Sequence, residues 1–220
     1  MKNVLIVALA ALWVFMFNSP MRGAEAVKEE PKTVMKEKPK TAKEMLEAIK
    51  GKYTLDDNGN VTYVHIIEVP GLSRDEIFVR AQNYFTYNYG SGKSVIQTND
   101  KEQGILVGKG LYKEVHTGVS LVTTVLDAWH ILRIDVKEGR ARAIVTLTDY
   151  DKTVSGGNTR PSVSSTPIAA EYPINPKGAF KTVMTKAFYK THERALASLD
   201  AVEKAIKEGS TSKSIENSDW

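Results

Sequence analysis

The chain has 220 residues, a formal net charge of +4 and no cysteine. This length is sufficient for one domain with an ordinary hydrophobic core, and the lack of cysteine excludes a disulfide framework, a thiol nucleophile and a zinc–thiolate site. The basic excess is mild, whereas a nucleic-acid-binding protein usually carries a strong, clustered one, so nucleic acid is not an expected partner.

Residues 1–26 have the layout of a secretory signal peptide. Lys2 precedes an apolar run of fourteen residues, Val4 to Phe17, and a small-x-small triplet ends at Ala26. At about 1.5 Å per residue, this run is too short to cross a hydrocarbon core of roughly 30 Å as a permanent helix. We therefore expect cleavage after Ala26, export to the periplasm or the cell exterior, and no stable transmembrane anchor afterwards.

Residues 27–45 are predicted to form a charged linker rich in proline, lysine and glutamate. Alternating charge with proline cannot bury enough apolar surface to offset chain entropy. Near the end of this segment, Thr41 and Glu44 have the spacing of a capping box, which predicts a short helix. We expect one domain over 46–208 and a polar tail over 209–220.

The predicted domain starts with a strand and a well-marked helix. The run 61–69 is rich in β-formers and ends at a Pro-Gly pair. Ser73 then has the position of a helix cap, and Leu72 and Ile77 have the spacing of a hydrophobic staple, which predicts a helix over 73–89.

A series of strands is predicted next. Short strands are expected at 94–98 and 104–112, and 115–126 is either further strand or a long β-connection. The clearest hairpin pairs 127–136 with 141–150.

The last part of the domain is predicted to be a long loop and a long helix. Residues 151–176 hold four prolines and four serines, which favours a loop that is either disordered or functional. Asn175-Pro176 resembles a helix start, and the helix is expected to run to 208 before Gly209. The fold class is therefore α+β: an antiparallel sheet of about five strands, with the helices 73–89 and 176–208 packed on one face.

The hairpin register predicts which face of the sheet is buried. It places 136 opposite 141, 134 opposite 143 and 132 opposite 145, so one face is wholly apolar and should lie under the helices. The other face is mixed, and it should carry an ion pair between Asp135 and Arg142 on neighbouring strands. Because tryptophan, tyrosine and arginine are enriched at binding hot spots, this face is the candidate ligand-binding surface. Its proposed residues are Trp129, Ile131, Arg133, Arg142, Ile144 and Tyr150. An ordinary solvated face, or one covered by the 151–176 loop, is the alternative.

Four sequence segments resemble a known family. They are IEVPGLS at 67–73, KSVIQ at 93–97, KEQGILVGKG at 101–110 and IDVKEGRAR at 134–142. They are similar to a bacterial secreted family of domains of unknown function with a TATA-binding-protein-like (TBP-like) fold. The resemblance covers roughly 61–151 and, more loosely, the closing helix. It implies secretion, a small antiparallel sheet crossed by helices, and no established activity. The family name refers to shape, so the resemblance does not imply DNA binding.

No motif predicts a catalytic residue, a metal site or a cofactor. The four histidines, His65, His116, His130 and His192, lack metal-site spacing, and His130 and His192 are interpreted as hydrogen-bonded residues at the edge of the core. The leading hypothesis is an exported, non-enzymatic binding or assembly module that holds a protein, peptide or glycan of the cell envelope.

The alternative hypothesis is an exported hydrolase. Its site would be assembled from residues dispersed in the sequence, such as His65 or His130 with Asp127 or Asp149. A concave pocket that joins a histidine, a carboxylate and a hydroxyl would favour this alternative.

Overall fold

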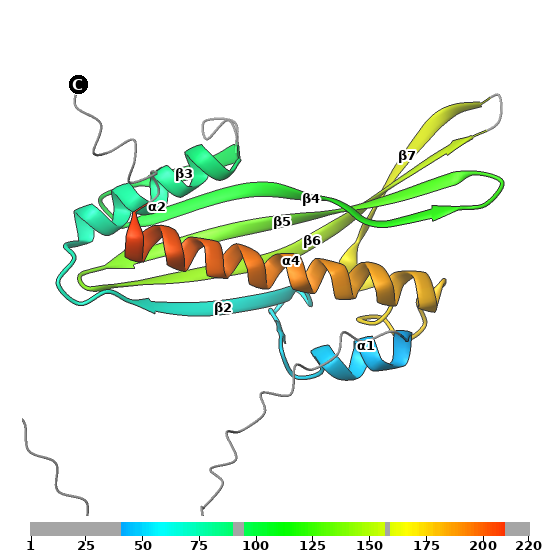
Figure 1. The fold of residues 1–220 in the computed structure, drawn as a ribbon, viewed down its shortest axis with the longest axis horizontal. Helices are drawn as coiled ribbons and strands as arrows, with labels where there is room; N and C mark the ends of the chain where they lie inside the picture. Colours follow the sequence, from blue (N-terminus) through cyan, green and yellow to red (C-terminus); the bar gives the residue numbers. More distant parts are fainter. Residues whose placement is uncertain (1–40, 90–94, 157–158, 210–220) are drawn as a thin grey trace, which may run out of the picture. The chain divides into compact units, whose positions relative to one another are not determined.

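The computed structural model describes residues 41–89, 95–156 and 159–209. The predicted signal peptide, most of the predicted linker and nearly all of the predicted tail lie outside these residues. The described residues form an α+β structure (Figure 1).

An antiparallel sheet of seven strands is the centre of this structure. The strands are β1 (Thr54–Leu55), β2 (Val61–Glu68), β3 (Ile96–Asp100), β4 (Ile105–Val119), β5 (Thr123–Lys137), β6 (Arg140–Gly156) and β7 (Thr159–Pro167). Their order is β1-β2-β6-β5-β4-β3, and β7 also pairs with β6. The fold class agrees with the prediction, and the two strands beyond the expected five are β1 and β7.

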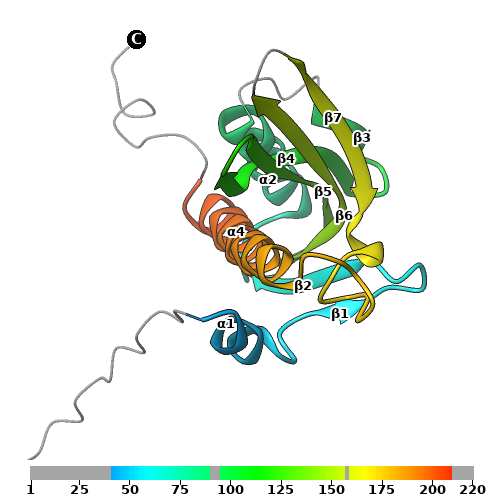
Figure 2. The same cartoon turned by 90° about the vertical axis from the view of Figure 1, so that its right-hand side faces the viewer.

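Helices cover one face of the sheet. They are α2 (Arg74–Asn88) and α4 (Lys181–Glu208). The helix α1 (Ala42–Ile49) packs against α4, and a short 3₁₀ helix, η1 (Ile168–Ala170), follows β7. Figures 1 and 2 show α2 and α4 on the same side of the strands. Both predicted N-terminal caps are present: Thr41 accepts a hydrogen bond from the Glu44 amide at 3.2 Å, and Ser73 accepts one from the Glu76 amide at 3.2 Å.

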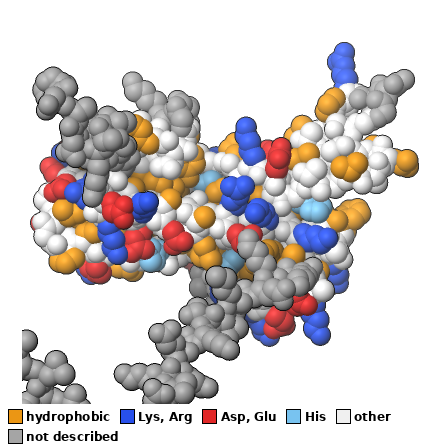
Figure 3. Space-filling view, in the orientation of Figure 1, with side chains coloured by type: hydrophobic (Ala, Val, Ile, Leu, Met, Phe, Trp, Pro, Cys, Tyr) orange, Lys and Arg blue, Asp and Glu red, His pale blue; other side chains and the backbone are white. Residues whose placement is uncertain are grey.

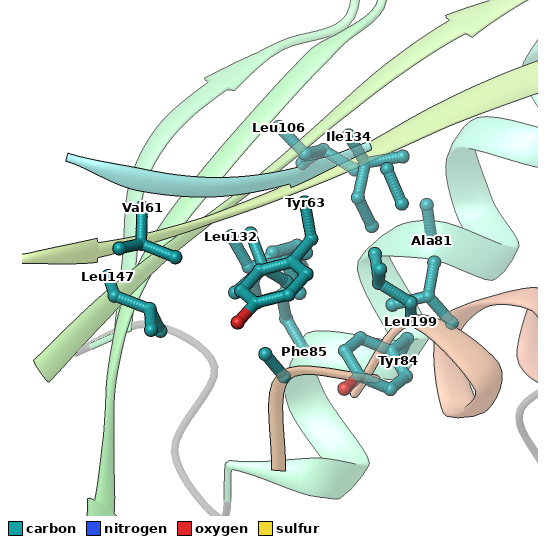
Figure 4. Close-up of a cluster of buried hydrophobic side chains, with 14 of the residues drawn as sticks. Val61, Tyr63, Ala81, Tyr84, Phe85, Leu106, Leu132, Ile134, Leu147 and Leu199 are labelled. Atoms are coloured by element: carbon teal, nitrogen blue, oxygen red, sulfur yellow. The ribbon is translucent and has the colours of Figure 1, made fainter. Parts of the chain in front are cut away.

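The core lies between these helices and the sheet (Figure 4). Leu132, Ile134 and Leu147 from β5 and β6 meet Phe85 from α2 there. Gly108 on β4 makes room for this contact, because a Cβ at that position would lie 2.4 Å from the Phe85 ring. The predicted hairpin register is confirmed: 136 lies opposite 141, 134 opposite 143 and 132 opposite 145.

The prediction of a loop over 151–176 is wrong for much of this segment. β6 continues to Gly156, and β7 returns beside it with Lys152 opposite Ser164. Prolines are tolerated in β7 because it is an edge strand, where a missing N–H need not break a central ladder. Residues 115–119 and 123–126 also form strand, as the end of β4 and the start of β5, and the chain turns between them at 120–122.

The start of the closing helix also differs from the prediction. Asn175 does not cap it: its side chain accepts a hydrogen bond from the Lys177 amide at 3.0 Å, within a turn. The helix starts at Lys181 instead, after Phe180 in the left-handed conformation with a φ of 50°. The Asn175 carbonyl accepts a hydrogen bond from the Gly178 amide at 2.9 Å, which closes a turn at this position.

Candidate functional site

The sheet face opposite α2 and α4 is accessible to solvent over four strands. We call it the open face. Three rows of side chains cross it from β2 through β6 and β5 to β4: Val64–Ile144–Arg133–Val107, Ile66–Arg142–Asp135–Ile105 and Thr62–Thr146–Ile131–Lys109. On β5, residues alternate between buried positions under the helices and half-buried positions on this face. The most exposed apolar side chains are Val64 and Ile66, with 56% and 51% of their surface accessible.

Two arginines are fixed by one carboxylate on the open face. Arg133 Nε donates to Asp135 Oδ1 at 2.7 Å, and Arg142 Nη2 donates to Asp135 Oδ2 at 2.6 Å. The predicted cross-strand pair of Asp135 and Arg142 is therefore present. The Asp135 side chain is only 15% exposed, whereas those of Arg133 and Arg142 are 44% and 51% exposed. Each guanidinium has five N–H donors, so both keep donors that these bonds do not use.

Trp129 is also held in place. Its indole N–H donates to Asp151 Oδ2 at 2.7 Å, and the Lys109 ammonium lies 4.5 Å from the centre of its ring. These contacts fix the orientation of a large aromatic group at one end of the open face. A fixed aromatic side chain can contact a partner with little further loss of conformational entropy.

The prediction that Tyr150 shares this face is wrong. A bulge interrupts the pairing of β5 with β6, so that Ala128 lies opposite Tyr150 while His130 lies opposite Leu147. Such a bulge reverses the faces beyond it, because side chains alternate along a strand. Tyr150 therefore lies on the helix side and is buried. The predicted residues that the structure brings together on the open face are Trp129, Ile131, Arg133, Arg142 and Ile144.

The residues of the hydrolase hypothesis are held in separate contacts. His65 Nε2 lies 2.7 Å from Glu203 Oε2 on α4. His130 is buried with its Nε2 3.0 Å from the Tyr89 hydroxyl, and Asp127 accepts a hydrogen bond from the Glu114 amide at 2.7 Å. No hydrogen bond among the described residues joins any of these histidines to Asp127 or Asp149.

Two histidines belong to the core, as interpreted from the sequence. Burial lowers the pKa of His130 to about 4, and its Nδ1 has no hydrogen-bond partner in the described part of the chain. His192 is buried with its Nδ1 3.0 Å from the Tyr63 hydroxyl, and burial also lowers its pKa. Both imidazoles are neutral at neutral pH, so they are polar elements of the core and carry no charge there.

The described residues contain no group of three or more His, Asp and Glu side chains placed to hold a metal ion. No helix within 41–89, 95–156 and 159–209 is long and apolar enough to cross a membrane.

Residues 63–150 match the model of a family described as a domain of unknown function, DUF4468, with a TBP-like fold. The predicted family resemblance is confirmed. Two solved structures are similar to the chain. One is a TBP-like protein from Parabacteroides distasonis ATCC 8503, with 16% identity and a TM-score of 0.48, covering 67% of this chain and 96% of that one. The other is a DUF4468 family protein from Bacteroides ovatus ATCC 8483, with 14% identity and a TM-score of 0.43, covering 72% and 94%. No curated protein matches the chain.

The DUF4468 match includes the whole central part of the open face, from Val64 on β2 to Ile144 on β6. It ends at Tyr150, so the far end of β6, all of β7 and α4 lie beyond the matched segment. The family description assigns no activity. An account of function therefore depends on the side chains of this chain.

The open-face residues on the two outer strands were not predicted from the sequence. They are Thr62, Val64 and Ile66 on β2, and Ile105, Val107 and Lys109 on β4. Their alternation within each strand is visible in the sequence. Their position beside Ile144 and Arg133 follows from strand pairings that bridge long sequence separations.

Proposed function

We propose that the protein is an exported, non-enzymatic binding or assembly module of the cell envelope that holds its partner on the open face. The observation that carries this proposal is the combination of exposed apolar side chains with two arginines fixed by Asp135. Burial of apolar surface supplies most of the favourable free energy of association, and an arginine held in place orients the partner through directional hydrogen bonds. A face with both features, on a rigid sheet, is suited to binding.

The open face is largely preorganised. The Arg133 and Arg142 side chains are held by Asp135, and the Trp129 ring is held by Asp151 and Lys109. Binding therefore requires little additional ordering of these long side chains. Ordering each of them would otherwise cost about 0.5–1.5 kcal/mol of binding free energy.

The partner class that fits this face is a protein, peptide or glycan of the envelope. Val64, Ile66 and Ile131 offer apolar contact, and the unused N–H groups of Arg133 and Arg142 offer hydrogen bonds to carbonyl, carboxylate or hydroxyl oxygens. Nucleic acid is a poor fit because both arginines already share the negative charge of Asp135. The separate contacts of His65, His130 and Asp127 give the hydrolase alternative no support.

The proposal is tested by capturing envelope partners from cells with the tagged protein. The test variant is Val64→Ser with Ile66→Ser, which removes exposed apolar groups from the open face. The matched control is Val79→Ser with Tyr87→Ser, which removes exposed apolar groups from α2 on the opposite side. Both variants should fold, because substitutions at exposed positions usually change stability by less than about 0.5 kcal/mol.

Partners captured by the wild type and by the control, but lost by the Val64/Ile66 variant, would support the proposal. Equal loss in both variants, or equal capture by both, would contradict it.

A further inference from the structure

A cleft of about 520 Å³ opens on the helix side of the sheet, away from the open face. It is lined by residues of β4, β5, β6, β7 and α4. The far ends of these four strands extend past the start of α4 (Figure 1). One row of its wall crosses four strands: His116, Leu126, Lys152 and Ser164 lie side by side. This volume is in the usual range of small-molecule sites, about 300–1,000 Å³.

The inner part of the cleft is apolar. Leu126 on β5 and Met184 on α4 are buried there, and Val183 is half-buried beside them. Apolar side chains also surround the mouth: Phe180 and Val119 are 72% and 78% exposed. Figure 3 shows hydrophobic side chains along the projecting strands at this end of the protein. An apolar ligand could therefore contact protein from the mouth to the inner end.

Positive charge lies at the wall of the same cleft. The Lys152 ammonium lies 5.5 Å from the centre of the Phe180 ring, and it forms no ion pair with a carboxylate in the described part of the chain. Burial, and then the nearby Lys186, lower the pKa of His116, so its imidazole is neutral and can donate one N–H. Among the described residues, Glu171 is the one carboxylate that lines the cleft. The free ammonium and the imidazole favour an anionic group on a ligand.

Phe180 is held in an unusual conformation at the mouth. Its φ of 50° is in the left-handed region, where a residue with a side chain costs about 1–2 kcal/mol. Conformations of this kind concentrate at functional sites. Here the strained backbone presents an exposed aromatic ring to the cleft and to Lys152.

We propose that this cleft binds a single-chain amphiphile with a carboxylate headgroup. The apolar chain would lie against Leu126, Val183 and Met184, and the carboxylate would lie near Lys152. The site is independent of the open face, because the two lie on opposite sides of the sheet.

Isothermal titration calorimetry tests this proposal on protein purified from cells that express the full chain. The probes are dodecanoate, dodecanol and dodecyltrimethylammonium, each below its critical micelle concentration. Lys152→Met removes the charge but keeps an apolar stem, and Ser164→Trp fills the cleft from the edge strand. Lys204→Met, at an exposed position on α4, is the matched charge control.

We expect one dodecanoate per protein chain and no binding of the cationic probe. Lys152→Met should weaken dodecanoate binding roughly three- to tenfold without changing dodecanol binding, because one partly exposed ion pair is lost. Lys204→Met should bind like the wild type, and Ser164→Trp should not bind. The Val64/Ile66 variant of the open face should also bind dodecanoate normally.

No binding of dodecanoate, equal binding of all three probes, or equal weakening by Lys152→Met and Lys204→Met would overturn the proposal. Lys152→Met removes the charge and its contact with the Phe180 ring but keeps an apolar side chain of similar length. It should therefore fold, and its result decides the matter even if Ser164→Trp fails to fold.

Discussion

The ring of Tyr112 on β4 lies flat against the imidazole of His130 on β5, with ring centres 3.8 Å apart and an angle of 10° between the planes. The pair connects the sheet to both large helices. The Tyr89 hydroxyl, just after α2, lies 3.0 Å from His130 Nε2, and the Tyr112 hydroxyl lies 2.8 Å from Ser198 Oγ on α4. The open face is therefore supported from behind by a polar aromatic cluster at the centre of the core.

Because of this cluster, we expect the free energy of unfolding to fall in mild acid. Burial lowers the pKa of His130 from 6.5 to about 4. Between these two pH values the imidazole is therefore mostly neutral in the folded state and mostly protonated in the unfolded chain. The stabilising contribution is complete above pH 6.5 and is lost progressively as the pH falls towards 4. At pH 5 the free energy of unfolding should be about 2 kcal/mol lower than at pH 7.5. Urea unfolding at both pH values measures this, with His130→Gln as the comparison. An equally large drop in His130→Gln would show that His130 is not responsible.

Gly110→Ala should destabilise the protein through the same cluster. A Cβ at this position would lie 2.5 Å from the Tyr89 ring and 2.6 Å from the His130 ring. Overpacking of this kind typically costs about 1–3 kcal/mol. Gly118→Ala on the same strand is the matched control, because its Cβ would meet the nearest atom at 3.6 Å. Chemical denaturation should separate the two variants, and equal stabilities would refute the packing argument.

Asp135→Asn should weaken partner binding more than it weakens folding. The change removes the negative charge that fixes Arg133 and Arg142. Because both guanidinium groups are partly exposed, the loss of each ion pair should lower the free energy of unfolding by less than about 1 kcal/mol. The arginines then become mobile, and binding must order them again. Denaturation and partner capture, measured on the same variant, test this expectation. Unchanged capture would mean that fixed arginines are unimportant for binding.

Phe180→Gly should be more stable than Phe180→Ala. Glycine adopts a φ of 50° without the steric cost that alanine retains, and the expected difference is about 1 kcal/mol. Both variants lose the ring beside Lys152, so the comparison isolates the backbone. Thermal unfolding of the pair provides the measurement. A more stable alanine variant would show that the left-handed conformation is not strained.

Local sequence signals were sufficient for the elements that depend on neighbouring residues. The caps at Thr41 and Ser73, and the register around 138–139, follow from short spacings and a tight turn, and all are present. The pair of Asp135 and Arg142 was predictable for the same reason.

The errors arose where distant pairing or a change of backbone conformation decides the structure. The bulge beside Trp129 moved Tyr150 to the opposite face, although the alternation of residues gives no sign of it. β7 was missed because an edge strand tolerates prolines and serines that usually indicate a loop. Neither Val64 nor Val107 could be placed on the open face before β2 was known to pair with β6 and β4 with β5.

The central claim is that the partner contacts the open face. A photo-activated crosslinking residue placed at Ile131, near the centre of that face, tests it in living cells, with the same residue at Val79 on α2 as the control. The account predicts a discrete crosslinked partner from position 131, its loss when Val64 and Ile66 are changed to serine, and no such product from position 79. Crosslinks from position 79 together with none from position 131 would contradict it.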